Sequence, residues 1–368
     1  MKILQMVPEM NAGGVERGTL EVARYLVEKG HESVVVSHGG TMVQELESAG
    51  VRHRTLAIHR KRLSSLGMVR PLRKLFQEEE PDIIHYRSRV PGWLAWLAWR
   101  KLPPAGRPHL VSSVHGLYSV NFYSAIMTRG ERVEAVSESA RRYILDHYPR
   151  VPPERIRVIP RGVDTRRYHP DFKPGEEWLA KWRKELPQLE GKLVVTLPGR
   201  ITRLKGHEDF LQVLTHLRDR KVPVHALVVG GSHPRKQAFR REIEEKVRQS
   251  QLEEWVTFAG HRNDLAEILA VSDIVCSCSR TPESFGRTTL EALALGKAVV
   301  GYDHGGVGEQ LKTCFPFGKV PPGEPLTMAG RIEAWSREPV FPVREMPYTL
   351  ERMLEGTLEL YEDLCSGR

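Results

Sequence analysis

The feature that most constrains the fold is a regular alternation of short apolar runs with longer amphipathic stretches. In the first half of the chain, the runs with the length and composition of buried strands are residues 3–7, 33–37, 82–86, 110–114 and 134–137. The intervening stretches with apolar residues at helical spacing are residues 14–29, 69–78 and 92–100. Strands that alternate with helices predict a parallel sheet covered on both faces.

A second series of the same kind begins near Leu193. Its expected strands are residues 193–197, 226–229, 256–258, 273–276 and 298–302, and its expected helices are residues 207–218, 235–248, 265–271 and 286–295. Residues 170–187, rich in Pro, Trp and charge, predict a linker, and the amphipathic stretch 349–365 is expected to cross back to the first domain. For a chain of 368 residues we predict an N-terminal domain over 1–169, a C-terminal domain over 170–345 and a final helix over 346–368.

The charge balance favours a polyanionic partner. Lys and Arg number 55 against 46 Asp and Glu, a formal net charge of +9, which suits nucleic acid, an anionic membrane or a phosphorylated substrate. An apolar fraction of 40% and a charged fraction of 27% exclude wholesale disorder.

Targeting and metal signals are absent from the sequence. No apolar run reaches the roughly 18 residues of a membrane span, and residues 1–8 do not form a signal peptide. The four cysteines form no Cys-x-x-Cys pair, so a zinc site is not indicated and reduced thiols are expected. We therefore expect a cytoplasmic protein.

The first glycine-rich loop, residues 8–18, follows a predicted strand and opens a predicted helix. Glycines such as Gly14 let backbone amides approach a phosphate at a helix N-terminus. A tight turn without a ligand explains the same residues. The loop departs from Gly-x-Gly-x-x-Gly, which argues against dinucleotide binding.

A second motif, residues 199–207, directly follows the predicted strand 193–197. Arg200 and Lys205 are bracketed by glycines, and a guanidinium and an ammonium five residues apart can converge on one diphosphate. Arg203, in the same motif, is expected to be a solvated charge.

A third motif, residues 282–291, leads into the predicted helix 286–295. Glu283 and Glu291 are eight residues apart, which is about 12 Å along a helix at 1.5 Å per residue. Two carboxylates at that spacing can accept hydrogen bonds from hydroxyls at opposite ends of a nucleotide-sugar. The amides near Arg287 and Thr288 would face the phosphates between them. A helix-terminal charge and a surface residue are the alternatives for the two carboxylates.

The pairing of Gly-Arg-x4-Lys-Gly with Glu-x7-Glu resembles the retaining glycosyltransferases of family 4, and the resemblance runs through nearly the whole chain. Further matching segments are residues 13–17, 114–116, 158–164, 228–231 and 305–309. The resemblance implies an α/β protein of the GT-B fold, with two Rossmann-like parallel-sheet domains facing across a cleft. Two segments depart from the family pattern: Arg161 stands where Asn is common, and His261-Arg262-Asn263 follows the segment 258–260.

The resemblance also implies roles by position. Arg200 and Lys205 would bind the donor diphosphate, Glu291 the ribose, and Glu283 the hydroxyls of the transferred sugar. His115 would lie beside the donor sugar and the reacting atoms, with a buried core histidine as the alternative. The remaining expected donor-binding residues are Gly14, Ser284, Phe285, Gly286, Arg287 and Thr288.

The expected mechanism needs no metal or other cofactor. The chain contains no Asp-x-Asp, so the leaving diphosphate would be neutralised by Arg200, Lys205 and helix amides. Retention of anomeric configuration follows from the resemblance. The absence of an obvious positioned base suits a same-face attack in which the leaving phosphate takes the acceptor's proton.

The acceptor is expected to bind the first domain. Residues 59–74 hold six Lys or Arg and no acid, and Trp93, Trp96 and Trp99 follow at helical spacing. A basic segment near aromatics suits an anionic membrane surface or a phosphorylated glycolipid, although a solvated charged face and a buried Trp stripe are the alternatives. Arg87 and Arg89, just after the strand 82–86, are expected with His115 to contact the acceptor.

The expected function is therefore transfer of a sugar, from a UDP-sugar in preference to a GDP-sugar, to a glycolipid or glycan. By analogy this belongs to bacterial lipopolysaccharide-core or other surface-polysaccharide synthesis, at the cytoplasmic face of the inner membrane. A nucleotide-sugar epimerase or hydrolase of similar fold is the main alternative. A basic nucleic-acid-binding protein lacks a recognisable module, and an NAD-dependent oxidoreductase lacks its glycine fingerprint.

Overall fold

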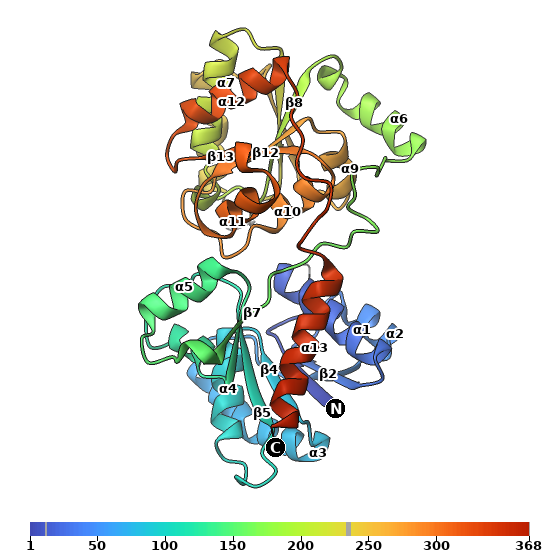
Figure 1. The fold of residues 1–368 in the computed structure, drawn as a ribbon, viewed down its shortest axis with the longest axis vertical. Helices are drawn as coiled ribbons and strands as arrows, with labels where there is room; N and C mark the ends of the chain where they lie inside the picture. Colours follow the sequence, from blue (N-terminus) through green and yellow to red (C-terminus); the bar gives the residue numbers. More distant parts are fainter. Residues whose placement is uncertain (12, 233–236, 368) are drawn as a thin grey trace. The chain divides into compact units, whose positions relative to one another are not determined.

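The computed structural model describes residues 1–11, 13–232 and 237–367. Ala12 of the first glycine-rich loop and Arg235, the predicted start of a helix, lie outside the described residues. The chain forms two compact units, Met1–Arg161 with Glu351–Arg368, and Gly162–Leu350 (Figure 1). The division falls after Arg161, so residues 162–169, expected in the first domain, belong to the second unit.

The first unit is built on a seven-stranded sheet in which every strand pair is parallel. Its order is β3-β2-β1-β4-β5-β6-β7. The strands are β1 (Lys2–Met6), β2 (Glu32–Ser37), β3 (Arg52–Thr55), β4 (Ile83–Tyr86), β5 (His109–Val114), β6 (Arg132–Ala135) and β7 (Ile156–Val158). Its helices are α1 (Gly14–Glu28), α2 (Val43–Ser48), α3 (Val69–Glu79), α4 (Arg89–Trp99), α5 (Glu138–His147) and α13 (Leu350–Ser366).

The second unit repeats this architecture with six parallel strands in the order β10-β9-β8-β11-β12-β13. The strands are β8 (Leu193–Pro198), β9 (Val224–Val229), β10 (Val256–Gly260), β11 (Ile274–Ser277), β12 (Ala298–Tyr302) and β13 (Lys319–Val320). The helices are α6 (Glu176–Glu185), α7 (His207–Asp219), α8 (Ala238–Gln249), α9 (Leu265–Ala270), α10 (Arg287–Ala294), α11 (Gly305–Cys314) and α12 (Pro325–Arg337).

The central strands are those that the apolar runs predicted, because a parallel strand covered on both faces needs nearly continuous apolar residues. All residues of β4 and β9 are buried, and β9 alone carries four Val and Leu residues. The sequence did not predict the edge strand β3, because this strand has no apolar run. Its sequence Arg-His-Arg-Thr is mostly exposed, and Arg52 and Arg54 are held by ion pairs to the buried carboxylate of Glu79.

The predicted linker at residues 170–187 is in part wrong, because α6 forms within it. Trp178 and Trp182 stack with ring centroids 4.9 Å apart, and Trp182 is buried against residues of β8, β9 and α9. The Trp residues that marked a linker are therefore the residues that attach this helix to the second unit.

The predicted Trp stripe of α4 is half-buried rather than buried. Trp93 donates its indole N–H to the Tyr123 carbonyl, and Trp99 donates to the Pro108 carbonyl. Arg129 lies over the Trp93 and Trp96 rings at 5.5 and 4.5 Å. The indole rings are thus partly buried and also contact polar groups, as amphipathic aromatic residues commonly do.

The strand order of each sheet reverses direction once, between β1 and β4 in the first unit and between β8 and β11 in the second. In open parallel sheets, ligands bind at the carboxyl ends of the strands at such a reversal. The loops after these four strands carry most of the residues that the sequence singled out.

Candidate functional site

In the second unit, β8 and β11 are neighbours where the strand order reverses, so the loops that follow them lie side by side. Lys205 Nζ lies 2.8 Å from Glu283 Oε1, although the two residues are 78 positions apart in sequence. The Ser279 hydroxyl donates to the same carboxylate oxygen, and His304 Nε2 donates to the Ser279 carbonyl at 2.7 Å. Lys205 and Ser279 thus hold one carboxylate, and His304 holds Ser279, so residues from three loops meet at Glu283.

The electrostatics of Glu283 follow from this arrangement. Burial acts to raise the pKa of its carboxyl, but the Lys205 charge and the hydrogen bonds from Lys205 and Ser279 outweigh burial and lower the pKa below its usual value. Glu283 is therefore ionised at neutral pH and acts only as an acceptor of hydrogen bonds.

A glycine sets the path of the Lys205 loop. Gly206 has φ +67°, and a Cβ built there would lie 1.7 Å from the Cys278 carbonyl oxygen. The backbone of this loop therefore packs directly on the end of β11, which no other residue type allows. This close approach holds Lys205 next to the segment that carries Glu283.

A second link between the two loops was not predicted from the sequence. Arg280 pairs with Asp209 at 2.5 Å and with Glu208 at 2.9 Å, both in the first turn of α7. Tyr302 donates its hydroxyl to Asp209 at 2.8 Å. The sequence signal for this ion-pair cluster is the acidic pair Glu208 and Asp209 after the Lys-Gly motif. Acidic residues in the first turn are equally typical of an ordinary helix N-terminus.

Arg200, the other expected phosphate ligand, is exposed at the end of β8. Among the described residues Arg200 makes no ion pair, whereas Arg203 pairs with Glu242 at 2.6 Å and lies over the Phe239 ring. The Arg203 side chain is 65% exposed, so it is the solvated charge that the sequence predicted, and it forms a surface ion pair with α8.

Helix α10 begins at the third motif. Its N-cap residue Gly286 has φ +92° and no side chain that could accept a hydrogen bond from the first amides of the helix, which begin at Arg287 and Thr288. The preceding Phe285 is buried, and its carbonyl accepts from Gln310 Nε2 at 2.7 Å. Ser284 is half-buried beside it.

Glu291 lies one turn further along α10 and is 6% exposed. Arg287 Nε donates to Glu291 Oε1 at 3.1 Å. Burial is the larger cause and the negative charge of Glu291 the second cause that raise the pKa of Tyr168 to about 12. The Tyr168 phenol therefore lies near Glu291.

In the first unit, His115 follows β5 and is half-buried. Arg161 Nη2 donates to His115 Nδ1 at 2.8 Å, so the neutral imidazole carries its proton on Nε2. Burial and then the Arg161 charge lower the pKa of His115 well below its usual value. Arg161, where the family pattern has Asn, also lies against α1, since a Cβ on Gly18 would meet Arg161 Nη1 at 2.1 Å.

A buried polar network lies on the same sheet. His85 Nδ1 is 2.6 Å from the Tyr361 hydroxyl of α13, and His85 Nε2 is 2.5 Å from Ser113 Oγ, which donates to Glu134 Oε2 at 2.5 Å. Burial lowers the pKa of His85 well below its usual value. Sequence reasoning missed this network, because each member alone is a single polar residue in an apolar strand or helix.

The two expected acceptor arginines have different surroundings. Arg87 is 1% exposed and makes no ion pair within the described residues, and its charge and a hydrogen bond to the Tyr361 hydroxyl act to lower the pKa of that phenol against the larger effect of burial. Arg89 is half-buried, lies over the Tyr118 and Tyr123 rings at 4.6 and 5.2 Å, and donates to Ser124 Oγ at 3.3 Å. Gly14 is exposed as the first residue of α1.

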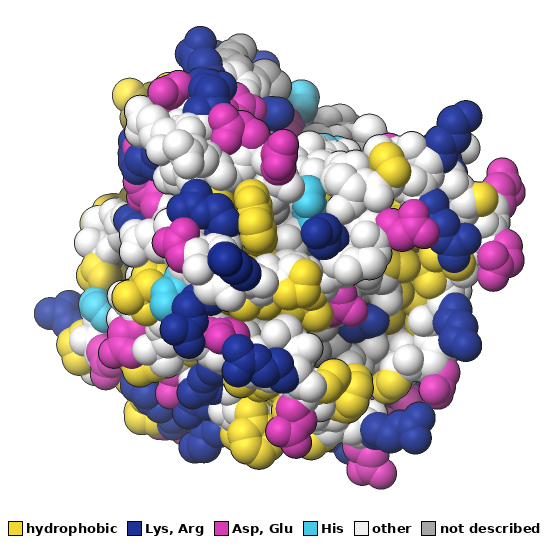
Figure 2. Space-filling view, turned by 90° about the horizontal axis from the view of Figure 1, so that it is seen from above, with side chains coloured by type: hydrophobic (Ala, Val, Ile, Leu, Met, Phe, Trp, Pro, Cys, Tyr) yellow, Lys and Arg dark blue, Asp and Glu magenta, His cyan; other side chains and the backbone are white. Residues whose placement is uncertain are grey.

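Charge on the molecular surface is mixed. On the face drawn in Figure 2, the Lys and Arg side chains in dark blue are interspersed with Asp and Glu in magenta. Within the described part of the chain, no helix has the length and apolar character to cross a membrane, and no three His, Cys, Asp or Glu residues are grouped to hold a metal ion.

Comparison with known proteins identifies relatives of both units. The family model described as Glycosyltransferase Family 4 matches residues 12–167, and the model described as Glycosyl transferases group 1 matches residues 180–346. Among solved structures, a glycosyltransferase from Rickettsia africae ESF-5 is 28% identical, with a TM-score of 0.83, and the match covers 100% of this chain and 99% of that one.

A second solved structure of the same fold and one curated protein extend the comparison. Anabaena Alr3699/HepE, solved in complex with UDP-glucose, has a TM-score of 0.77 at 21% identity, with 100% of this chain and 99% of that chain covered. The lipopolysaccharide core biosynthesis mannosyltransferase LpsB of Rhizobium meliloti (strain 1021) is 30% identical over 152 residues, which is 41% of this chain and 42% of LpsB. The chain spans about half the length of the curated relatives that it matches.

Proposed function

The chain belongs to the group 1 glycosyltransferases of the GT-B fold, and on that premise we propose that it transfers a sugar from a nucleotide-diphosphate sugar to a glycolipid or phosphorylated glycan, with retention of anomeric configuration. The observation that carries the proposal is the Lys205–Glu283 pair at the strand-order reversal of the second unit, beside the amide end of α10. A cation, a carboxylate and the amide end of a helix are what a diphosphate and a sugar require.

The proposed role of the cations is to stabilise the leaving group. As the bond between the anomeric carbon and the phosphate oxygen breaks, negative charge develops on the diphosphate. Arg200, Lys205 and the amides of Arg287 and Thr288 would stabilise that charge, so the step needs no metal or other cofactor. Gly14, at the N-terminus of α1, would contribute a further amide.

The carboxylates would hold hydroxyl groups. Glu283 is an ionised acceptor, which suits hydroxyls of the transferred sugar, and the buried Glu291 would accept from the ribose. Ser284, Phe285 and Gly286 would shape the donor site between them. Lys205 would then bridge the sugar end and the phosphate end of the donor.

The acceptor hydroxyl would attack the anomeric carbon on the face that the phosphate leaves. A bond forms between the acceptor oxygen and the anomeric carbon, and the acceptor proton passes to the departing phosphate oxygen. His115, neutral and holding its proton on Nε2, would donate a hydrogen bond beside the reacting atoms without adding charge. Arg87 and Arg89 would serve the acceptor.

UDP-sugars rank first as donors, since the Anabaena protein of the same fold was solved with UDP-glucose. The lipopolysaccharide-core relative and the basic segment 59–74 support an acceptor in bacterial lipopolysaccharide or another surface glycan. We place this activity in the cytoplasm, with contact at the anionic inner face of the membrane.

A thermal-shift panel of UDP, GDP, ADP and their common sugars tests the donor proposal. A nucleotide at about 100 times its dissociation constant should stabilise the protein by about 2.7 kcal/mol. No response to any nucleotide, together with salt-sensitive binding of an oligonucleotide, would instead favour the nucleic-acid alternative.

Lys205→Ala tests the role of the charge. In a transfer assay containing EDTA, we expect a loss in kcat of about 10²- to 10³-fold, because a donor to the developing charge is removed. Arg203→Ala, which removes a cation from the same loop, is the matched control and should stay near the wild-type rate. Near-normal turnover by Lys205→Ala, or donor consumption at the full rate without acceptor, would contradict the proposal; the second result would indicate an epimerase or hydrolase.

A further inference from the structure

The loop between β12 and α11 packs directly against the segment that carries Glu283. Gly305 has φ +59°, and a Cβ built there would lie 2.5 Å from the Glu283 carbonyl oxygen. The Gly306 amide donates to the same carbonyl at 2.8 Å. A glycine is needed at such a close approach, because a side chain would collide with the neighbouring backbone. This loop therefore fixes the backbone of Glu283, while other groups hold its carboxylate.

His304, directly before these glycines, is half-buried and directs its imidazole toward Ser279. Its Nε2 lies 2.7 Å from the Ser279 carbonyl oxygen, and because a carbonyl only accepts hydrogen bonds, Nε2 carries a proton and donates it. His304 is the N-cap residue of α11, yet its side chain makes no capping hydrogen bond. The imidazole therefore holds the neighbouring loop rather than the end of its own helix.

Ser279 is 4% exposed and is bound through both its backbone and its side chain. Its carbonyl accepts from His304, and its hydroxyl donates to Glu283 Oε1, since an ionised carboxylate only accepts. The hydrogen bond from Lys205 ends on the same oxygen at 2.8 Å. Among the described residues, Glu283 Oε2 receives no hydrogen bond, and the side chain is 25% exposed. One carboxylate oxygen is thus held by the protein, and the other is open to a ligand hydroxyl.

We propose that His304 is a positioning residue that, through Ser279, orients the Glu283 carboxylate and so sets the affinity for the sugar half of the donor. The inference rests on the proposed function, in which Glu283 binds hydroxyls of the transferred sugar. Hydrogen bonds weaken steeply when their angle departs from linearity, so a carboxylate that can turn binds a hydroxyl less well. Without the imidazole, Ser279 is no longer fixed, and Oε2 loses its direction.

Calorimetric titration with UDP and with UDP-glucose separates the two halves of the donor. Where the nucleotide panel identifies a different nucleotide, that nucleotide and its glucose ester take their place. For His304→Ala we expect the Kd of UDP-glucose to rise at least about fivefold, because a hydrogen bond to a charged group is misaligned. The Kd of UDP, which has no sugar for Glu283 to bind, should stay within about twofold of wild type.

His304→Gln is the conservative variant. Its amide Nε2 lies the same number of bonds from Cβ as the imidazole Nε2, so it can donate to the Ser279 carbonyl. We expect this variant to bind UDP-glucose within about threefold of wild type. A residue needed only for packing would not be replaced by a hydrogen-bond donor of different shape.

A double-mutant cycle tests whether His304 acts through Ser279. Ser279→Ala removes the hydroxyl and keeps the carbonyl. We expect it to weaken UDP-glucose binding at least as much as His304→Ala does, and the double variant to lose no more than Ser279→Ala alone. Losses that multiply in the double variant would mean that His304 contacts the donor itself, which would overturn the positioning role.

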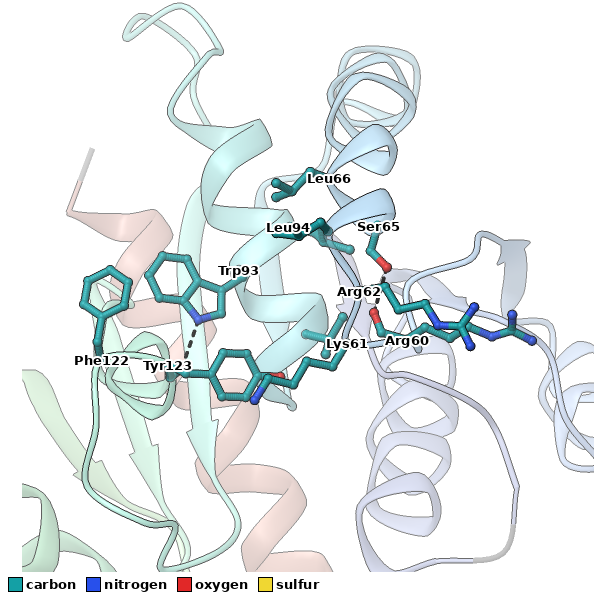
Figure 3. A pocket seen from close by; sticks show the side chains of 11 residues that line it. Arg60, Lys61, Arg62, Ser65, Leu66, Trp93, Leu94, Phe122 and Tyr123 are labelled. Atoms are coloured by element: carbon teal, nitrogen blue, oxygen red, sulfur yellow. Dashed lines mark hydrogen bonds between the residues drawn. The ribbon is translucent and has the colours of Figure 1, made fainter.

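Two variants are the controls. His216→Ala removes a half-buried imidazole at the end of α7 opposite to Lys205. Phe122→Ala changes the first unit: Figure 3 shows Phe122 beside Trp93 at a cavity that none of the residues of this proposal line. Both controls should bind UDP and UDP-glucose as wild type does.

Two further results would overturn the inference. An equal loss of UDP and UDP-glucose binding in His304→Ala would show a general structural role. Unchanged UDP-glucose binding in both His304→Ala and Ser279→Ala would show that the carboxylate needs neither residue. Failure of the proposed function is distinguishable, because the wild-type protein would then bind no nucleotide of the panel, and the inference would fall with it.

Discussion

Glu283 and Lys205 are each about one-quarter exposed, and the Lys205 charge helps to keep the Glu283 carboxylate ionised. The sequence predicts both as site residues but assigns them to different parts of a donor. Their contact through a 2.8 Å hydrogen bond could not be predicted, because 78 residues separate them and the geometry depends on two loops meeting.

The pH dependence of stability should reveal this pair. Because the folded pKa of Glu283 is lowered, its contribution to stability is present above the unfolded value near 4.5 and is lost as pH falls through the folded pKa. We expect Glu283→Gln to have a lower urea midpoint than wild type at pH 7, with the difference shrinking below pH 4.5. A difference that is constant from pH 7 to pH 3 would show that the ionised pair does not stabilise the fold.

Arg87 differs from this pair, because it is a buried cation that makes no ion pair within the described residues. Replacing a buried, uncompensated charge with an apolar side chain of similar length is commonly neutral or stabilising. We therefore expect Arg87→Met to raise the free energy of unfolding by about 1 kcal/mol in urea denaturation. A loss of 2 kcal/mol or more would show instead that the guanidinium is paired within the fold.

At the scale of elements, the loops of the candidate site are positioned by backbone contacts as much as by side chains. At Gly206 the Cys278 carbonyl leaves no space for a Cβ. At Gly286 a Cβ would lie 2.6 Å from Val307 Cγ2, so there is no space there either. The glycines in the motifs were predictable as loop residues. Their contacts were not, because the packing partners, Val307 of α11 and Cys278 after β11, lie in other elements of the fold.

Gly206→Ala tests this close packing. Two unfavourable effects combine: the left-handed backbone costs an L-residue roughly 1–2 kcal/mol, and the Cβ collides with a carbonyl. Gly191→Ala is a matched control, since Gly191 has φ +68° with nothing within 4 Å of the built Cβ. We expect Gly206→Ala to destabilise by at least about 2 kcal/mol more than Gly191→Ala in chemical denaturation. Equal losses would mean that the loop moves aside.

At the scale of the whole molecule, the chain leaves the first unit after Arg161 and returns to it with α13 (Figure 1). The predicted crossing of the last amphipathic stretch is thus what the structure shows. The buried side of this helix contains Met353, Leu354, Thr357, Leu360, Tyr361 and Leu364.

We expect the two units to unfold in separate transitions, so a mutation in one unit should change the stability of that unit alone. Leu360→Ala in α13 removes a buried side chain and should destabilise the first unit by about 2–5 kcal/mol. In calorimetry, we expect it to lower the transition that UDP does not shift. Glu355→Ala, on the exposed side of the same helix, is the control and should leave both transitions in place. If Leu360→Ala lowered only the UDP-sensitive transition, the assignment of α13 to the first unit would be wrong.

The local order of the amino acids was sufficient to predict two parallel sheets, most of their central strands and the motif loops that follow β8 and β11, because apolar runs and glycine turns act over a few residues. It was not sufficient for the polar edge strand β3 or for α6, whose stability comes from Glu79 and from a Trp stack on the second sheet. The tertiary structure alone brought together Lys205 with Glu283, Arg161 with His115, and His85 with Tyr361, 276 residues away. Such contacts depend on where the topology returns each strand and loop, and no local pattern in a single sequence carries that information.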